Sequence, residues 1–260
     1  MHKLSALIFD VDGTLADTER DGHRVAFNRA FEEEGLDWFW DEGRYGELLR
    51  VTGGKERIRL YLSEDWPDLL REPGIDERIK ALHAAKTRHY LSLLQTGAIP
   101  LRPGVRRLLQ EARVAGLRLA IATTTTPDNV TTLLRTALGE DGPGWFEVIA
   151  AGDIVPAKKP APDIFDVALS ELGLPPAACV ALEDSENGLR ASLGAGVPTV
   201  VTTNGYTRDQ DFSGAIAVLD GLGEPDSPVT VQVGIAPASG YVDVASLVAW
   251  HAAAGAKASP

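Results

Sequence analysis

Residues 4–14 read Leu-Ser-Ala-Leu-Ile-Phe-Asp-Val-Asp-Gly-Thr, an apolar run that ends in two aspartates separated by one residue. The apolar part, residues 4–9, has the composition of a buried β-strand. Side chains two positions apart point to the same side of an extended chain, so Asp10 and Asp12 would enter the crevice where parallel sheets bind ligands. Two close carboxylates repel each other, and Mg²⁺, a cation that prefers oxygen ligands, would relieve that repulsion. The simpler alternative is a turn with two solvated aspartates.

The second half of the chain alternates short apolar runs with helical patterns. Strand-like runs occupy residues 117–122, 146–150, 178–182 and 197–202, with a weaker one at 215–219. The segments between them carry apolar residues every three or four positions, as amphipathic helices do. This alternation predicts an α/β fold whose core is a Rossmann-like parallel sheet with helices on both faces.

Residues 18–97 contain no strand-like run and are helical in pattern throughout. One apolar stripe consists of Val25, Phe27, Ala30 and Phe31, and another of Ile79, Leu82, Ala85, His89 and Leu93. We therefore expect a helical cap domain over residues 18–97, inserted into a core made of residues 1–17 and 98–260. Residues 221–260 are rich in Gly, Pro, Ala and Ser and form an extended tail of that core. Within this tail, residues 229–233 could form part of a short strand pair, and the end is expected to fray.

Composition excludes several classes of protein. No window of about 18 apolar residues is present, so no membrane span is expected. The formal net charge of −12 disfavours nucleic acid and anionic membranes as partners. The single cysteine, Cys179, lies in an apolar run and fits a buried thiol in a reducing compartment. The first strand-like run starts almost at the first residue, which leaves no room for a targeting peptide. We expect a cytoplasmic monomer.

Polar residues also stand at or beyond the ends of later strand-like runs. Thr123 follows residues 117–122, where a hydroxyl can bind a phosphate oxygen or merely cap a helix. Lys159 would supply a point charge for a phosphoryl group, or else lie solvated in a loop. Glu183 and Asp184 follow residues 178–182, where they complete a metal site or form an acidic helix cap.

In order and in placement, these residues resemble the four motifs of the haloacid dehalogenase superfamily. The matching segments are Asp10-Val11-Asp12-Gly13-Thr14, Thr123, Lys159-Pro160 and Glu183-Asp184. The helical insertion resembles the mobile cap of the superfamily's first subclass, and the resemblance extends to about Thr207. It implies a phosphatase, because the superfamily's dehalogenases lack a second acid at the position of Asp12.

The resemblance also implies a role for each motif residue. Asp10 would be the nucleophile that forms an aspartyl-phosphate, and Asp12 the general acid that protonates the leaving alcohol and later activates water. Asp10, the backbone carbonyl of Asp12 and Asp184 would bind Mg²⁺, the expected cofactor. Thr123 and Lys159 would cradle the phosphate, while Glu183 would orient Lys159 or hold a metal-bound water.

Two segments of the insertion narrow the expected substrate. Residues 52–58, Thr-Gly-Gly-Lys-Glu-Arg-Ile, look like a phosphate loop in which glycines allow close backbone approach, although an ordinary interhelical turn is the alternative. With residues 37–41, Asp-Trp-Phe-Trp-Asp, they resemble the CbbY-type phosphatases, which remove a phosphate from the Rubisco inhibitor xylulose 1,5-bisphosphate. The resemblance implies a small sugar-phosphate substrate. Its contacts would come from Glu19, His23, Tyr45, Gly53, Gly54, Lys55, Arg57, Thr124 and Thr125.

The sequence departs from that family's pattern in two places, one of which is the extended tail after Leu222, to which no function is assigned. Residues 20–22, Arg-Asp-Gly, make the segment before His23 one residue longer than usual, which leaves the register of Glu19 and His23 open. Three other functions stay open as well. They are a sugar-phosphate mutase similar to β-phosphoglucomutase, a phosphatase for phosphoglycolate or another short phosphoester, and an inactive binding protein on the same fold.

Overall fold

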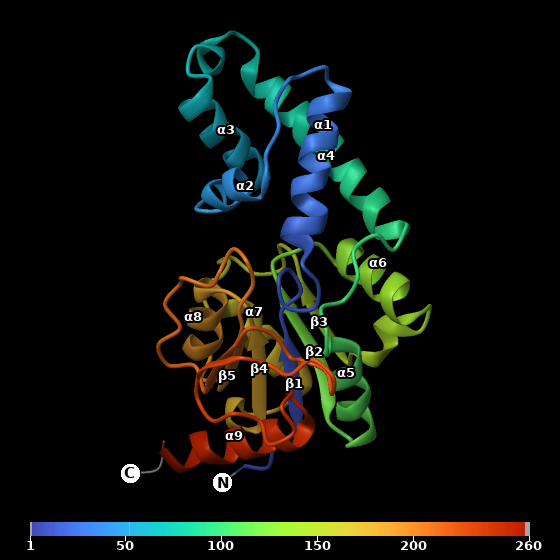
Figure 1. Ribbon diagram of the computed structural model, residues 1–260, viewed down its shortest axis with the longest axis vertical. Helices are drawn as coiled ribbons and strands as arrows, with labels where there is room; N and C mark the ends of the chain where they lie inside the picture. The colour runs from blue at the N-terminus through green and yellow to red at the C-terminus, as the bar shows by residue number, and fades with distance from the viewer. Residues whose placement is uncertain (1, 52, 258–260) are drawn as a thin grey trace. The chain divides into compact units, whose positions relative to one another are not determined.

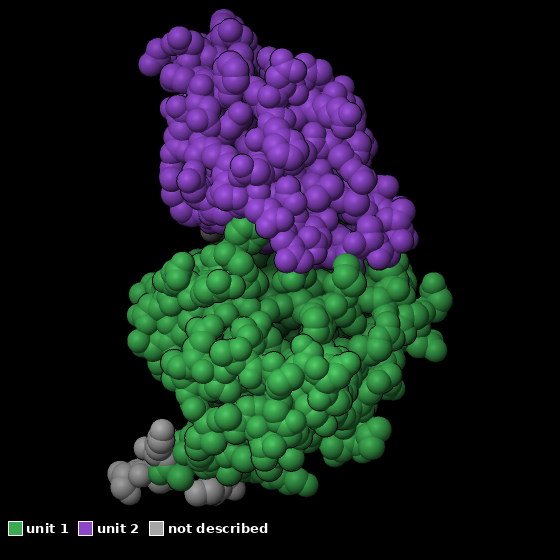
Figure 2. Space-filling model, viewed as in Figure 1, with its two compact units in different colours: residues 1–17, 100–260 green, residues 18–99 purple. Residues whose placement is uncertain are grey.

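The computed structural model describes residues 2–51 and 53–257 of the chain, which divides into two compact units. Unit 1 comprises the chain up to Asp17 and from Pro100 onward, and unit 2 comprises Thr18–Ile99 (Figure 2). Across the described ranges, no helix combines the length and the apolar character that crossing a membrane requires.

Unit 1 is built on a seven-stranded sheet in the order β3-β2-β1-β4-β5-β6-β7. The strands are β1 (Ala6–Phe9), β2 (Arg118–Thr123), β3 (Val148–Ala151), β4 (Cys179–Glu183), β5 (Thr199–Thr202), β6 (Ala217–Leu219) and β7 (Val231–Val233). All neighbouring strands pair in parallel except β7, which runs antiparallel to β6. The predicted α/β fold with a parallel sheet is confirmed.

Helices cover the sheet of unit 1, as Figure 1 shows. They are α5 (Val105–Val114), α6 (Pro127–Leu138), α7 (Asp163–Leu172), α8 (Glu186–Gly194) and α9 (Val244–Lys257), with short 3₁₀ turns at Gly142–Trp145 and Pro176–Ala178. Ala6 and Ile8 of β1 pack in one cluster with Phe165 of α7, while Leu7 and Phe9 alternate onto the other face and are fully buried too. Burial on both faces explains why the strands read as continuous apolar runs.

Unit 2 is helical, with aromatic rings at its centre. Its elements are the π-helix η1 (Thr18–His23), α1 (Arg24–Glu33), α2 (Glu42–Leu48), α3 (Gly54–Asp65), the 3₁₀ turn η2 (Leu69–Arg71) and α4 (Ile75–Gln95). The ring of Trp40 lies 4.7 Å from Phe27 and 4.9 Å from Phe31, centroid to centroid, and is fully buried. Trp38 stands edge-on to Phe31 at 5.4 Å. These tryptophans form the core of the unit.

The tail of unit 1 is more ordered than the sequence predicts. Where fraying was expected, α9 forms, and Leu247 and Trp250 are buried. The Trp250 indole donates to the carbonyl of Ile235 at 3.0 Å, and the His251 ring bonds the carbonyl of Ala177 at 2.8 Å. The expectation of a frayed end was wrong because it rested on the high content of alanine and other small residues. It overlooked Leu247 and Trp250, whose spacing of three residues places them on one helix face.

Candidate active site

The sheet order brings the ends of three neighbouring strands together. In the register, Phe9 of β1 pairs with Ile121 of β2 on one side and with Leu182 of β4 on the other. Thr123 and Glu183 are therefore the last residues of strands that flank β1, and Asp10 directly follows it. All three side chains are buried at the carboxyl edge of the sheet.

Lys159, from the loop between β3 and α7, joins two of the carboxylates. Its Nζ lies 2.6 Å from Asp10 Oδ1 and 2.6 Å from Glu183 Oε1, and 5.2 Å above the ring of Phe165. Only 8% of the Lys159 side chain is exposed. Burial alone would lower the pKa of Lys159, but the charges of Asp10 and Glu183 outweigh it and raise that pKa. The ammonium is therefore held protonated.

The carboxylates of Asp10, Glu183 and Asp184 form a cluster with room for a cation. One oxygen from each lies within 4.8 Å of the others, and all three residues are buried. Burial raises the pKa of Glu183 to about 8, and it also raises the pKa of Asp184, with the charges of Asp10 and Glu183 adding to the effect. Glu183 Oε2 is buried without a hydrogen-bond partner. One ammonium beside three carboxylates leaves excess negative charge, so a divalent cation with oxygen ligands fits this donor set.

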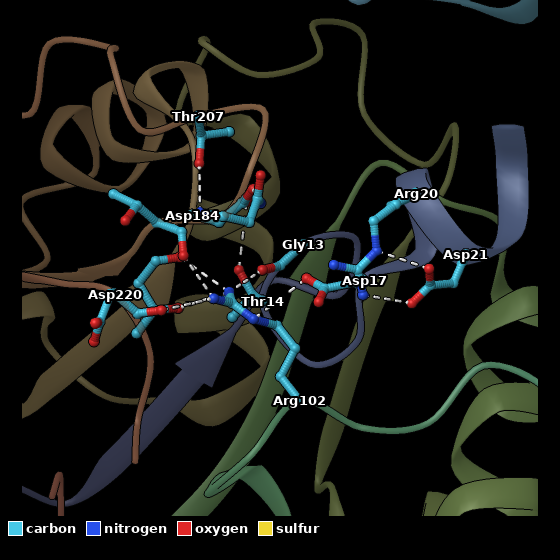
Figure 3. Close-up of polar contacts among 12 residues, drawn as sticks. Gly13, Thr14, Asp17, Arg20, Asp21, Arg102, Asp184, Thr207 and Asp220 are labelled. Atoms are coloured by element: carbon cyan, nitrogen blue, oxygen red, sulfur yellow. Dashed lines mark hydrogen bonds and ion pairs between the residues drawn. The ribbon is translucent and has the colours of Figure 1, made fainter. Parts of the chain in front are cut away.

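The loop after β1 packs directly against Asp184. Gly13 has φ +91°, and a Cβ built there would lie 2.2 Å from Asp184 Oδ2, so only glycine fits. The Thr14 hydroxyl donates to Asp184 Oδ1 at 3.5 Å (Figure 3), and the Asn204 amide donates to Asp184 Oδ2 at 2.7 Å. Asp12 is half-buried and forms a bridge with Ala16. These contacts restrict the backbone conformation of the loop where it passes the acidic cluster.

Thr124 and Thr125 continue from β2 toward α6. Thr124 is exposed, and Thr125 is half-buried. The backbone N–H of Thr125 donates to Thr123 Oγ1 at 3.3 Å, while Asn129 donates to Thr125 Oγ1 at 3.2 Å. The hydroxyl of Thr123 is therefore oriented by its own loop.

In unit 2, three of the predicted substrate-binding residues contact one another. The Tyr45 hydroxyl donates to the Glu19 carboxylate and accepts from Arg57 at 2.8 Å. The Arg57 guanidinium lies 5.0 Å from the centre of the Tyr45 ring and 3.7 Å from Glu19 Oε2. Arg57 is 7% exposed, so its charge is largely engaged within the unit.

His23 lies in a second polar group of unit 2, with two residues that sequence reasoning missed. Lys86 Nζ donates to His23 Nδ1 at 2.8 Å, and the His23 ring stacks on Tyr90 at 3.9 Å. Burial lowers the pKa of His23 well below its usual range, and the charges of Lys86 and Arg57 lower it further. Lys86 and Tyr90 are four positions apart on α4, a helical spacing that could have flagged them as a pair.

The segment whose register the sequence left open forms the π-helix Thr18–His23. A π-helical turn takes up one residue more than an α-helical turn, which matches the one-residue-longer segment. Gly22 sits in this turn, where a Cβ would lie 2.6 Å from Ile99 Cδ1 and 2.7 Å from Tyr90 Cε2. The space at this position of the turn therefore fits a glycine and no larger side chain.

The glycine-rich segment forms the start of α3. Gly53 has φ +100°, and a Cβ on Gly54 would lie 2.6 Å from the ring of His83. Lys55 is exposed in the first turn, whereas Thr52 lies outside the described residues. Of the two cations predicted to serve this loop, Lys55 is thus the accessible one and Arg57 the buried one.

Comparison with known proteins agrees with this geometry. A family model of haloacid dehalogenase-like hydrolases matches residues 4–220. The chain is 50% identical over 248 residues to the plasmid-borne protein CbbY of Cupriavidus necator, a match that covers 95% of this chain and 97% of that protein. It therefore belongs to the haloacid dehalogenase-like hydrolases and is a phosphatase of that family, which confirms the resemblance inferred from the motifs.

Solved structures show the same similarity. CbbY of Rhodobacter sphaeroides in complex with phosphate is 50% identical, with a TM-score of 0.73 over 84% of this chain and 94% of that one. A mutant of the same protein in complex with xylulose 1,5-bisphosphate matches equally well, with a TM-score of 0.73 and the same coverage.

Proposed function

We infer that this phosphatase removes a phosphate from a small sugar phosphate through an aspartyl-phosphate on Asp10, with Mg²⁺ as cofactor. The observation that carries the proposal is the buried contact of Lys159 with both Asp10 and Glu183. The Asp10 carboxylate has an electron pair that can attack phosphorus. The Lys159 ammonium beside it supplies the positive charge that offsets the negative charge of the incoming phosphoryl group.

The reaction divides into two transfers. An oxygen of Asp10 forms a bond to phosphorus while the bond from phosphorus to the sugar oxygen breaks, and Asp12 donates its proton to that oxygen. Asp12 then takes a proton from water, whose oxygen attacks phosphorus and releases inorganic phosphate from Asp10. Thr123 and Lys159 bind phosphate oxygens throughout, so the chain's main contribution is positioning and charge neutralisation.

The acidic cluster supports the metal proposal. Asp10, Asp184 and the backbone carbonyl of Asp12 would hold Mg²⁺, and Glu183 would orient Lys159. When bound, the ion supplies charge that offsets the negative charge of the carboxylates and of the transferred phosphoryl group. A chelator should therefore abolish phosphate release, and added Mg²⁺ should restore it. Ca²⁺ should inhibit, because it accepts looser and more variable coordination. Full activity in a chelator would contradict the role given to Asp184.

Xylulose 1,5-bisphosphate is the substrate we propose, with Glu19, His23, Tyr45, Gly53, Gly54 and Lys55 as contacts in unit 2 and Thr124 and Thr125 as contacts in unit 1. The support is the 50% identity to a protein whose structure contains that sugar bisphosphate. The exposed Lys55 beside two glycines would suit a second phosphate, whereas Arg57 would act by orienting Tyr45 and Glu19.

The deciding experiment measures phosphate release from a panel of sugar phosphates. We expect xylulose 1,5-bisphosphate to give the highest kcat/KM, above xylulose 5-phosphate, phosphoglycolate and β-glucose 1-phosphate. Conversion of β-glucose 1-phosphate to glucose 6-phosphate without phosphate release would identify a mutase instead. Preference for phosphoglycolate would contradict the sugar-bisphosphate assignment but leave the phosphatase chemistry intact.

A further inference from the structure

Arg102 is a buried guanidinium that bonds an unusual number of backbone carbonyls in unit 1 (Figure 3). Its Nη1 donates to the carbonyls of Gly13 and Thr202, the latter at 3.0 Å. Its Nη2 donates to the carbonyls of Thr203 at 2.6 Å and Asp220 at 3.4 Å. The side chain is 8% exposed, and its charge is met by Asp17 at 3.4 Å. One planar side chain thus connects the loop after β1 with the ends of β5 and β6.

The contact with Gly13 bears on the reacting groups. Gly13 directly follows Asp12, so the hydrogen bond to its carbonyl fixes the peptide unit between Gly13 and Thr14, one residue beyond the proposed general acid. A Cβ on Gly13 would overlap the Asp184 carboxylate, so this backbone also lies against the acidic cluster. A rotation of that peptide would therefore move Gly13 and Thr14 against Asp184 and alter the backbone that leads directly from Asp12.

Arg102 also fixes the other end of the same loop. Its backbone N–H donates to the carbonyl of Leu15 at 2.9 Å, and the neighbouring Leu101 forms an antiparallel bridge with Ala16. With Asp17 paired to the guanidinium, this residue and its neighbour hold the loop from Gly13 to Asp17 at each end. These are the last residues of unit 1 before the chain enters unit 2.

We propose that Arg102 is a positioning residue for phosphoryl transfer, holding the loop that directly follows Asp10 and Asp12 so that these two residues keep their reactive geometry. The inference rests on the proposed function, since it concerns the same reaction. A lysine at this position would keep the charge but lose the planar fork that reaches several carbonyls at once. The reacting groups would still be present, but their geometry would be less well fixed.

Arg107 offers a matched control in the same unit. It too is a multidentate guanidinium, with Nε donating to Glu224 at 2.9 Å, Nη1 to the carbonyl of Val242 at 3.0 Å and Nη2 to the carbonyl of Gly223 at 2.8 Å. Its contacts fasten the tail of unit 1 rather than the loop after β1. Arg107→Lys therefore reports the effect of losing a half-buried guanidinium fork without touching that loop.

The experiment compares Arg102→Lys with Arg107→Lys on the panel substrate that the wild-type enzyme hydrolyses fastest. We expect Arg102→Lys to lower kcat by about 30- to 100-fold with KM changed by less than about threefold, since small misplacements of reacting groups reduce rate steeply. Arg107→Lys should keep kcat within about twofold, even where both variants lose similar thermal stability. A second readout needs no substrate: amide hydrogen exchange of residues 10–16 should quicken by about tenfold or more in Arg102→Lys only.

Each outcome decides the matter. If the wild-type enzyme releases phosphate and Arg102→Lys has the same kcat, the positioning role is wrong and the proposed function is unaffected. A wild-type enzyme that hydrolyses nothing on the panel contradicts the proposed function, while the exchange measurement still tests the loop. If Arg102→Lys fails to fold, Arg102→Met with Asp17→Asn removes both charges of the pair and takes its place. Failure of both variants to fold would assign Arg102 to stability alone and overturn the proposal.

Discussion

At the residue scale, the site is a balance between one cation and three carboxylates. Lys159 contacts Asp10 and Glu183, while Asp184 is anchored by Asn204 and Thr14 instead. Removing either partner of a buried ion pair leaves a charge that the protein must neutralise in another way. A substitution of Asp10 therefore changes the charge balance of the site as well as removing the proposed nucleophile.

Asp10→Asn tests the proposed nucleophile with nearly unchanged side-chain volume. Phosphate release should fall by more than about a thousandfold, because a neutral amide cannot form the acyl phosphate. Circular dichroism should show a folded protein, since the crowded carboxylates lose one negative charge along with the Lys159 pair. Activity above a few per cent of wild type would contradict the mechanism.

His23 should make stability depend on pH. Burial lowers the pKa of His23, so the folded protein keeps this ring neutral where the unfolded chain, with a histidine pKa near 6.5, takes up a proton. Stability is then complete above that value and declines as pH falls. Between pH 7 and pH 5, wild type should lose more unfolding free energy than His23→Gln, by up to about 2 kcal/mol. Urea titrations at both pH values measure the unfolding free energies, with His2→Gln as the control. Equal losses in wild type and His23→Gln would contradict the role given to His23.

At the element scale, what the sequence predicted and what it missed have different physical origins. The strands were predictable, because strands buried on both faces need continuous apolar runs. The residues that end them were predictable too, because the carboxyl ends of parallel strands lie at one edge of the sheet, where ligands bind. The π-helix at Thr18–His23 was not, since its sequence, Thr-Glu-Arg-Asp-Gly-His, has no apolar residues whose spacing could indicate a helix type. Arg102 was also missed as a site residue, because its partners lie far away in the chain. The spacing of Lys86 and Tyr90 indicates a shared helix face, but it could not reveal the distant partner His23.

Gly22→Ala probes the π-helix directly. The added methyl would lie within 2.7 Å of both the Tyr90 ring and Ile99, so the turn must shift, at a cost of about 1–3 kcal/mol. Gly43→Ala in α2 is the control, because its methyl would meet only Asp41 Oδ1 at 3.5 Å. That change should be neutral or stabilise the protein by up to about 1 kcal/mol. Urea unfolding followed by tryptophan fluorescence measures both, and equal stability of the two variants would show that the turn tolerates a side chain.

At the scale of the whole molecule, net charge and substrate charge have the same sign. The chain carries a formal charge of −12, so it repels a phosphorylated sugar at long range and must bind it through local cations. Unit 1 supplies Lys159, which is buried and already shared by two carboxylates. In unit 2 the Arg57 guanidinium bonds Tyr45, whereas Lys55 is exposed. A second phosphate on the substrate would therefore depend on Lys55 more than on Arg57.

Lys55→Ala should consequently harm the turnover of a bisphosphate far more than that of a monophosphate. A charged hydrogen bond to phosphate contributes roughly 1.5–3 kcal/mol, so kcat/KM for xylulose 1,5-bisphosphate should fall by about ten- to a hundredfold. The loss should appear in kcat as well as in KM if binding of the second phosphate also favours the reactive state. Lys80→Ala is the matched control, since it removes an exposed cation of the same unit that pairs with Glu77 at 2.7 Å. It should leave both substrates within about twofold of wild type, as surface ion pairs contribute little. If Lys55→Ala slows both substrates equally, Lys55 does not distinguish the second phosphate, and the bisphosphate assignment loses its main support within this chain.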